Sequence, residues 1–446
     1  MHLDNWLSQR AETCPDRCAL IADGSALTYA ELEREATATA RLLAAKGARR
    51  GATVALTLAP GIDYVVVLHA LMKLGAVAYP VNTRLAEAEL ASELERAGSV
   101  LRVDGRADLG MTEADLPLLG EHDLDAVHCR ILTSGTSGRP RPVGLTYGNH
   151  LWSAVGSAFN LGVEPTDRWL CCLPLFHVGG LSIVMRSVIY GTAAVIHDGF
   201  DVDRVASALV GDGVTVLSVV TTQLVRLLEA GVDLLPLRAV LIGGGPVPQD
   251  VLEEAIGRGA TVVQTYGLTE AASQVTTLSP ADAGRKLGSA GRQLLTTHLR
   301  IQDGEILVQG PTVAPGTADE EGWLHTGDLG RIDDEGFLYV TDRRGDVIVT
   351  GGEKVIPTEV EEVLLRHPEV VDAAAVGRSD PQWQEAVTAV VVLRAGGRAS
   401  ADELRSHCAA ELAGYKVPKR VEFVGELPRT ASGKLLRREL RGTKEG

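Results

Sequence analysis

The segment VTVLSVVTTQLVRLLEAGVDLLPLRAVLIGG, residues 214–244, carries the pattern that decides the fold. Residues 214–220 and 237–244 are apolar runs typical of buried strands, and residues 221–231 between them have helical character. A strand, a helix and a second strand in this order are typical of a parallel sheet that is covered on both faces. The segment therefore predicts an α/β fold.

The same alternation of strands and helices continues on both sides of this segment. It is seen at residues 27–81, at 192–213 and again at 249–259. We therefore predict a large N-terminal domain, residues 1–342, built on doubly covered and mostly parallel sheets.

After about residue 285 the pattern changes to short strand pairs joined by turn sequences, such as 298–311 and 329–342. These pairs predict a small β-barrel-like subdomain. Residues 347–446 then form a smaller α+β unit, which begins with a hairpin at 347–355. The boundary is expected at DRRGD, with residues 343–346 as the hinge.

Three helix starts are expected from capping residues. Thr28 with Glu31, and Thr358 with Glu361, have the spacing of a capping box. Asn149 is expected to cap the helix that follows residue 145.

Composition excludes several classes of function. The chain has 446 residues and a formal net charge of −15, which argues against nucleic acid as the main partner. No secretory signal is visible, and no apolar stretch approaches the roughly 18 residues of a membrane-spanning helix. Six cysteines without a C-x-x-C pair argue against zinc and favour a reducing cytoplasm.

The stretch TSGTSGRPRPV, residues 133–143, is the first candidate site. A turn of glycines and hydroxyls after an apolar strand presents N–H and OH groups to phosphate oxygens, and arginines add charged hydrogen bonds. A flexible surface loop is the alternative. The candidate phosphate contacts are Thr133, Ser134, Gly135, Thr136, Ser137, Gly138, Arg139 and Arg141.

Five later motifs follow in order. They are LIGGGPVP (241–248), QTYGLTE (264–270), WLHTGDLG (323–330), VTDRRGD (340–346) and LPRTASGK (427–434). Each has a structural alternative when taken alone: Asp328 could close a turn, Tyr266 could be a core residue, and Lys434 could be a solvated surface lysine.

Together and in this order, the motifs from Thr133 to Lys434 resemble those of the acyl-adenylate-forming superfamily, which includes acyl-CoA synthetases, luciferases and peptide-synthetase adenylation domains. The resemblance implies that a carboxylate attacks the α-phosphate of Mg²⁺-bound ATP to give acyl-AMP and pyrophosphate. It further implies that a mobile C-terminal domain swings about the hinge, and that the thiol of CoA takes the acyl group.

The resemblance also implies roles for individual residues. Lys434 would bridge the carboxylate and the α-phosphate, Glu270 would ligate Mg²⁺, and Asp328 with Arg343 would hold the ribose. Thr136 is expected to take part in catalysis. Further nucleotide contacts are expected at Gly244, Gly245, Pro246, Thr265, Tyr266, Gly267 and Thr269, the hinge at Gly345, and the CoA channel at Gly351 and Gly352.

Residues 145–191 resemble the branch of this family that converts o-succinylbenzoate to its CoA thioester in menaquinone biosynthesis. His177 is expected beside the reacting carboxylate; a core histidine is the alternative. Arg186 would either receive the second carboxylate of the acid or form a salt bridge with an acidic residue. Weaker acid contacts are expected at Ser218, Thr221, Gly267 and Leu268.

Three alternatives stay open at this point. The acid substrate could be another alkyl or aryl acid, and the acceptor could be a carrier protein instead of CoA. The chain could also be a nucleotide-binding homologue without catalysis, because the family usually has Gly-Lys-Pro-Lys-Gly where this chain has Gly-Arg-Pro-Arg-Pro at 138–142. Glu270, Asp328, Arg343 and Lys434 favour the enzyme. Assembly of the chain into a homo-oligomer also stays open.

Overall fold

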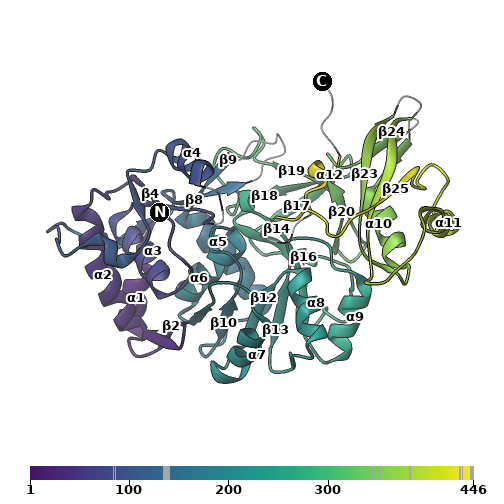
Figure 1. Cartoon of the computed structure of the whole chain (residues 1–446). Coiled ribbons are helices and arrows are strands. Elements are labelled where there is room, and N and C mark those ends of the chain that lie inside the picture. Colours follow the sequence, from purple (N-terminus) through teal and green to yellow (C-terminus); the bar gives the residue numbers. More distant parts are fainter. Residues whose placement is uncertain are drawn as a thin grey trace. The chain divides into compact units, whose positions relative to one another are not determined.

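The structure is a computed structural model, and it describes residues 1–83, 85, 87–133, 141–343, 345–350, 353–380, 383–430, 433 and 435–441 (Figure 1). The chain divides into two compact units. The first contains Met1–Arg300 and Leu307–His325, and the second contains Ile301–Ile306 and Thr326–Gly446. The hinge predicted at 343–346 stays a prediction.

The core of the first unit is a nine-stranded sheet of order β16-β15-β14-β13-β12-β10-β11-β2-β3. The six strands from β14 to β2 run parallel, and antiparallel strands close both edges. The strands are β2 (Cys18–Ala22), β3 (Ser25–Thr28), β10 (Arg168–Cys171), β11 (Ala193–Ile196), β12 (Val216–Val219), β13 (Ala239–Ile242), β14 (Val262–Leu268), β15 (Ser273–Thr277) and β16 (Arg292–Gln293).

A second sheet of the first unit has the order β6-β4-β5-β8-β9, parallel except for β9, and β1 pairs with β7. These strands are β1 (His2–Asp4), β4 (Thr53–Leu56), β5 (Val77–Pro80), β6 (Leu101–Val103), β7 (Glu121–Asp123), β8 (Val127–Thr133) and β9 (Arg141–Thr146).

Nine α-helices accompany these sheets in the described part of the first unit. They are α1 (Trp6–Thr13), α2 (Tyr29–Ala45), α3 (Ile62–Leu74), α4 (Glu87–Ala97), α5 (Tyr147–Leu161), α6 (Val178–Tyr190), α7 (Val202–Gly211), α8 (Thr221–Glu229) and α9 (Gln249–Gly257), with short 3₁₀ turns η1 (Arg106–Leu109) and η2 (Thr269–Ala271). None of the described helices is long and apolar enough to cross a membrane.

The predicted strand–helix–strand unit at 214–244 is confirmed as β12, α8 and β13, and Figure 1 shows α8 beside α9. Every residue of β12 is buried, so both faces of that strand are covered. Leu217 and Val219 pack in one core cluster with Leu224 and Leu227 of α8. The continuous apolar run therefore predicted double coverage correctly.

The second unit includes β20 (Leu338–Arg343) and most of β19 (Leu324–Ile332), which belong to a four-stranded sheet with β17 (His298–Gln302) and β18 (Glu305–Gln309). This sheet corresponds to the predicted small β subdomain. The rest is a five-stranded sheet of order β22-β21-β24-β23, with β25 beside β24. Its elements are β21 (Ile348–Thr350), β22 (Glu353–Val355), α10 (Pro357–Leu365), β23 (Val370–Asp380), β24 (Gln384–Leu393), α11 (Ala401–Glu411), β25 (Arg420–Phe423) and α12 (Arg437–Leu440).

Two of the three predicted helix starts are wrong in detail. The capping box of Thr28 and Glu31 is present at α2. In α5 the N-cap is Thr146 and Asn149 is its partner in the capping box, because β9 lies between the candidate phosphate loop and the helix.

The predicted capping box of Thr358 and Glu361 does not form. The N-cap of α10 is Ile356, and the Thr358 hydroxyl donates to the carbonyl of Thr341 at 2.6 Å. Glu361 instead accepts a hydrogen bond from the backbone N–H of Ala375 at 2.8 Å. Tertiary contacts therefore take both side chains away from local capping.

Four buried histidines gather in the first unit: His69 of α3, His122 of β7, His128 of β8 and His150 of α5. The rings of His122 and His128 both stack on Tyr147, with centroids 4.3 and 5.1 Å away. Burial is the main cause that lowers the pKa of all four, to about 3 for His69 and His122 and about 4 for His128. The cationic side chain of Lys73 further lowers the pKa of His69 and His122, and that of Arg186 further lowers the pKa of His150.

We expect the first unit to lose stability steeply as the pH falls below about 6.5. The folded state holds these histidines neutral, whereas the unfolded chain binds protons from pH 6.5 downward, so acid favours unfolding. At pH 5 a single histidine whose pKa drops to about 3 contributes roughly 2 kcal/mol of destabilisation. Urea unfolding followed by tryptophan fluorescence between pH 7 and pH 5 measures this slope.

His128→Phe is the matched variant, because both ring nitrogens of His128 lack a hydrogen-bond partner among the described residues and the ring packs on an aromatic side chain. His128→Phe should make the free energy of unfolding depend less steeply on pH between pH 7 and pH 5. Substitution of the exposed His298 by Gln should leave this pH dependence unchanged. Equal slopes in the wild type and His128→Phe would contradict the explanation.

Candidate active site

The edges of the candidate phosphate loop lie opposite each other on β8 and β9. Thr133 pairs with Arg141 in the antiparallel ladder, and the Thr133 hydroxyl donates to the carbonyl of Arg141 at 3.3 Å. The loop therefore connects the two strands of a hairpin. Ser134, Gly135, Thr136, Ser137, Gly138 and Arg139 lie outside the described residues.

The glycine segment after β13 lies beside β14. A Cβ on Gly243 would come within 2.8 Å of the Thr265 methyl group, so the two backbones approach closely there. Gly244 has a φ of +85°, which favours glycine. The predicted nucleotide contacts Gly244 and Gly245 thus follow the end of β13, beside Thr265 of β14.

The motif YGLTE begins in β14, where Gly267 lies very close to the backbone of β15. A Cβ at this position would lie 1.6 Å from the carbonyl oxygen of Ser273, so only glycine fits. A β-bulge at Tyr266/Gly267 re-aims the end of β14, and Thr269 and Glu270 follow in η2. The turn places the candidate Mg²⁺ ligand Glu270 directly after the strand end.

Helix α6 carries both principal candidates for acid binding. His177 is its N-cap residue, with its ring 4.6 Å from that of Phe176. Ser182 of α6 lies 3.4 Å from Ser273, hydroxyl to hydroxyl. The helix therefore lies beside Ser273, whose carbonyl oxygen approaches Gly267.

Arg186 of α6 is 2% exposed. Its Nη2 donates to the Ser153 hydroxyl at 3.1 Å, and its Nε has no hydrogen-bond partner among the described residues. Burial lowers the pKa of its guanidinium, and Tyr190 opposes this shift. Within the described part of the chain no carboxylate forms an ion pair with Arg186, so the salt-bridge alternative has no partner there.

Ser218 and Thr221 connect to the same region of the first unit. The indole N–H of Trp169 donates to the Ser218 hydroxyl at 2.9 Å, and the Arg186 guanidinium lies 5.7 Å from the centre of the Trp169 ring. The Thr221 hydroxyl donates to the carbonyl of Pro246 at 3.0 Å. The predicted acid contacts Arg186 and Ser218 thus share Trp169 as a neighbour.

The two predicted ribose ligands are direct partners in the second unit. Asp328 of β19 faces Arg343 of β20 in the antiparallel ladder. Gly327 directly precedes Asp328 in β19 and has a φ of +72°. Its N–H donates to a Glu305 carboxylate oxygen at 2.9 Å, and this hydrogen bond holds the backbone of β19 next to Asp328.

The remaining predicted residues belong to the second unit as well. A Cβ on Gly345 would meet nothing within 4 Å. The predicted hairpin is confirmed by the pairing of β21 with β22, and Thr350 faces Glu353. Gly351, Gly352 and Lys434 lie outside the described residues.

Sequence reasoning missed several residues that the structure brings to these positions. Ser153 and Trp169 contact Arg186, and they come from α5 and β10. His128, Cys129 and His150 place their ligand-type atoms within 4.8 Å of one another, although they lack metal-motif spacing. A cation there would face the charge of Arg186, which already acts on His150. The prediction of no zinc site is not tested.

The described motif residues lie on or next to strands of an α/β fold, and matches to protein families identify the class of protein. Residues 7–119 and 107–317 match the AMP-binding enzyme family, and residues 359–434 match the C-terminal domain of AMP-binding enzymes. The chain belongs to this family.

Specific relatives are similar over their full length. A 2-succinylbenzoate–CoA ligase of Bacillus cereus is 43% identical, with 98% of each chain covered. The o-succinylbenzoate CoA synthetase of Bacillus subtilis in complex with its acyl-adenylate intermediate has a TM-score of 0.93 and 40% identity, covering 100% of this chain and 99% of that one. The same enzyme with ATP and a magnesium ion has a TM-score of 0.93 and 39% identity, covering 99% and 100%.

Proposed function

We propose that this chain is an AMP-forming acid–thiol ligase that activates o-succinylbenzoate with ATP and transfers the acyl group to CoA. The products are o-succinylbenzoyl-CoA, AMP and pyrophosphate, and the reaction belongs to menaquinone biosynthesis. The observation that carries the proposal is the full-length similarity to 2-succinylbenzoate–CoA ligase, which leaves no large part of either chain unmatched.

The chemistry of activation requires little proton transfer. A carboxylate is already ionised at pH 7, so the first half-reaction depends on positioning and on neutralising phosphate charge. Thr133–Gly138 with Arg139 and Arg141 would hold the phosphates. The positive side chains matter here because the protein as a whole carries a net charge of −15.

Glu270 suits Mg²⁺ because that ion prefers carboxylate oxygens, and Glu270 lies in η2, directly after the end of β14. A bound Mg²⁺ would supply positive charge to the phosphates. Asp328 and Arg343 would hold the ribose hydroxyls, since a carboxylate accepts and a guanidinium donates hydrogen bonds. Gly244, Gly245, Pro246, Thr265, Tyr266 and Thr269 would surround the nucleotide.

The acid would lie along α6. His177 at the helix N-terminus would meet the reacting carboxylate, and Arg186 would receive the second one. Arg186 is buried and has no carboxylate partner among the described residues. Burying such a guanidinium costs folding free energy unless an anion binds to it. Ser218, Thr221, Gly267 and Leu268 would complete the acid contacts.

The transfer step would use a second arrangement of the C-terminal part. In this proposal residues 1–342 bind ATP and the acid, 343–346 form the hinge around Gly345, and 347–446 form the mobile domain with Gly351 and Gly352 at the CoA channel. We place the enzyme in the cytoplasm, where its six free thiols would stay reduced.

Pyrophosphate release with a panel of aryl and alkyl acids, together with mass detection of AMP and the CoA thioester, tests the function. We expect o-succinylbenzoate to give the highest kcat/KM, and a stoichiometric acyl-AMP in the absence of CoA. Faster turnover of another acid would contradict the substrate and leave the reaction class intact. Nucleotide binding without pyrophosphate release would identify a non-catalytic homologue.

A further inference from the structure

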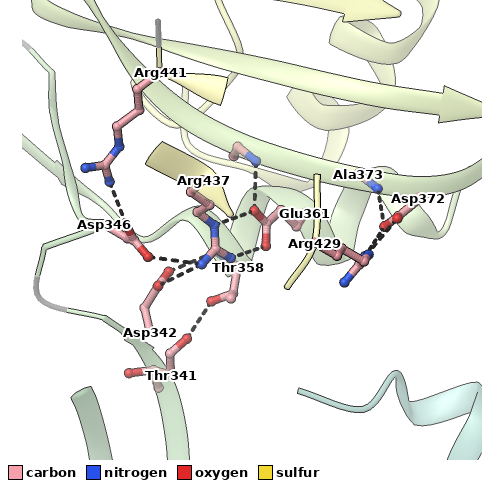
Figure 2. Close-up of polar contacts among 11 residues, drawn as sticks. Thr341, Asp342, Asp346, Thr358, Glu361, Asp372, Ala373, Arg429, Arg437 and Arg441 are labelled. Atoms are coloured by element: carbon pink, nitrogen blue, oxygen red, sulfur yellow. Dashed lines mark hydrogen bonds and ion pairs between the residues drawn. The ribbon is translucent and has the colours of Figure 1, made fainter. Parts of the chain in front are cut away.

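Arg437 is the first residue of α12 and follows Lys434 by three positions. Its guanidinium makes a two-point pair with Glu361 of α10, shown in Figure 2: Nε donates to Oε1 at 3.1 Å and Nη2 to Oε2 at 2.6 Å. Two parallel charged hydrogen bonds fix the plane of a guanidinium as well as its position. Arg437 is therefore held in one orientation.

The third nitrogen of Arg437 faces two more carboxylates, as Figure 2 shows. Nη1 lies 3.3 Å from Oδ2 of Asp346 and 3.6 Å from Oδ1 of Asp342. Arg441 also donates to Asp346, at 2.8 Å. Asp342 directly precedes the proposed hinge and Asp346 is its last residue, so Arg437 contacts both ends of that segment.

This cluster is largely removed from water. The side chains of Arg437, Glu361 and Asp342 are 13%, 9% and 1% exposed. Burial alone would lower the pKa of Arg437, but the three carboxylates outweigh it and raise that pKa. Burial raises the pKa of Glu361, and Arg437 opposes the shift. Without Arg437, three acidic groups would face one another with little water to screen them.

A second arginine anchors the chain on the other side of Lys434. Arg429 Nη1 donates to the carbonyl of Gly433 at 3.0 Å, and its Nη2 lies 2.7 Å from the carboxylate of Asp372 on β23 (Figure 2). The N–H of Leu436 donates to the carbonyl of Pro428 at 2.8 Å. The residues that flank Lys434 are therefore tied to the sheet and helix of the second unit.

We propose that Arg437 is a positioning residue for acyl-AMP formation, which it serves by fixing the segment that carries Lys434 to Glu361 and to both ends of the hinge. This inference rests on the proposed role of Lys434. A rotation within 343–346 would change the separation of Arg437 from Asp342, whereas the pair with Glu361 lies wholly on the C-terminal side and would be kept. The cluster thus links the placement of Lys434 to the state of the hinge.

The test compares wild type, Arg437→Gln, Lys434→Ala and the double variant in two separate half-reactions. These are acyl-AMP formation from ATP and o-succinylbenzoate, and transfer from preformed acyl-AMP to CoA. We expect Arg437→Gln to lower kcat of acyl-AMP formation by about 10- to 100-fold, since small misplacements cost up to about 100-fold. The KM for ATP and the transfer step should change less than about threefold.

The double variant separates positioning from a general structural role. If Arg437 acts through Lys434, Arg437→Gln should cost less than about threefold when Lys434 is already alanine, because effects of coupled residues are not additive. Arg437→Lys keeps the positive charge but loses the two-point pair. Its kcat for acyl-AMP formation should lie between those of wild type and Arg437→Gln. Arg366→Gln, which breaks an exposed ion pair with Glu411 in the same unit, is the control.

Equal losses in both half-reactions, no loss at all, or a full Arg437 effect in the Lys434→Ala background would each overturn the inference. Should Arg437→Gln fail to fold, Arg437→Lys replaces it in the test. The inference then requires that Arg437→Lys lowers acyl-AMP formation more than transfer to CoA. Acyl-AMP formation that persists in Lys434→Ala would instead contradict the proposed role of Lys434 itself.

Discussion

Lys434→Ala is expected to lower acyl-AMP formation by about 100- to 1000-fold, the range found when a preorganised charge or donor at a transition state is removed. The attacking carboxylate and the α-phosphate are both anionic, so their approach depends on a cation that contacts both. Transfer from preformed acyl-AMP to CoA should be largely retained, because in the proposed mechanism Lys434 serves only the first half-reaction. Pyrophosphate release without CoA and thioester formation from synthetic acyl-AMP measure the two steps.

Lys419→Ala is the matched control for this prediction. Lys419 carries the same charge in the same unit, and its ammonium contacts only a backbone carbonyl and the Trp383 ring among the interactions described for it. It should retain both half-reactions. A parallel fall of both half-reactions in Lys434→Ala would show that the division of roles about the hinge is wrong.

Arg186→Gln should raise the KM for o-succinylbenzoate by up to about 100-fold and leave the KM for ATP within about twofold. A charged hydrogen bond in a buried place contributes roughly 1.5 to 3 kcal/mol, which corresponds to this range. The structure supports the assignment because Arg186 is buried and hydrogen-bonded to Ser153, without an ion-pair partner in the described residues. Steady-state kinetics with each substrate varied in turn provide the measurement.

A monocarboxylic analogue makes this test independent of folding. An acid that lacks the second carboxylate should be a poor substrate for wild type, and Arg186→Gln should no longer discriminate between it and o-succinylbenzoate. Ser182→Ala, which removes a neighbouring hydroxyl of the same helix that bonds a backbone carbonyl, is the matched control. Equal effects on ATP and on both acids would identify Arg186 as a structural residue.

Local sequence patterns predicted the sheets well for a simple reason. Apolar runs such as 216–219 and 239–242 must be buried on both faces, and a parallel sheet between helices is the arrangement that achieves this. The capping box of Thr28 and Glu31 was also predictable, because each partner lies within one turn of the other. Burial of consecutive apolar residues and capping within a turn depend on short stretches of chain alone.

The same local rule failed at Thr358 and Glu361. Their spacing is that of a capping box, but Thr341, Ala375 and Arg437 compete for these side chains with contacts across 14 to 76 residues of sequence. Such partners are invisible in a window of four residues, and a two-point pair with a guanidinium outweighs a single local hydrogen bond.

The amino-acid sequence by itself determined the α/β class, the order of the motifs and the types of side chain available for phosphate, ribose and Mg²⁺, since these depend on residue type and short spacing. Only the tertiary structure decided that Arg186 meets Ser153 and Trp169 and that Arg437 meets Asp342, Asp346 and Glu361. The physical reason is that the charge of an arginine can be balanced by groups from any part of the chain. Which groups these are depends on how the strands and helices pack, and no local pattern records it.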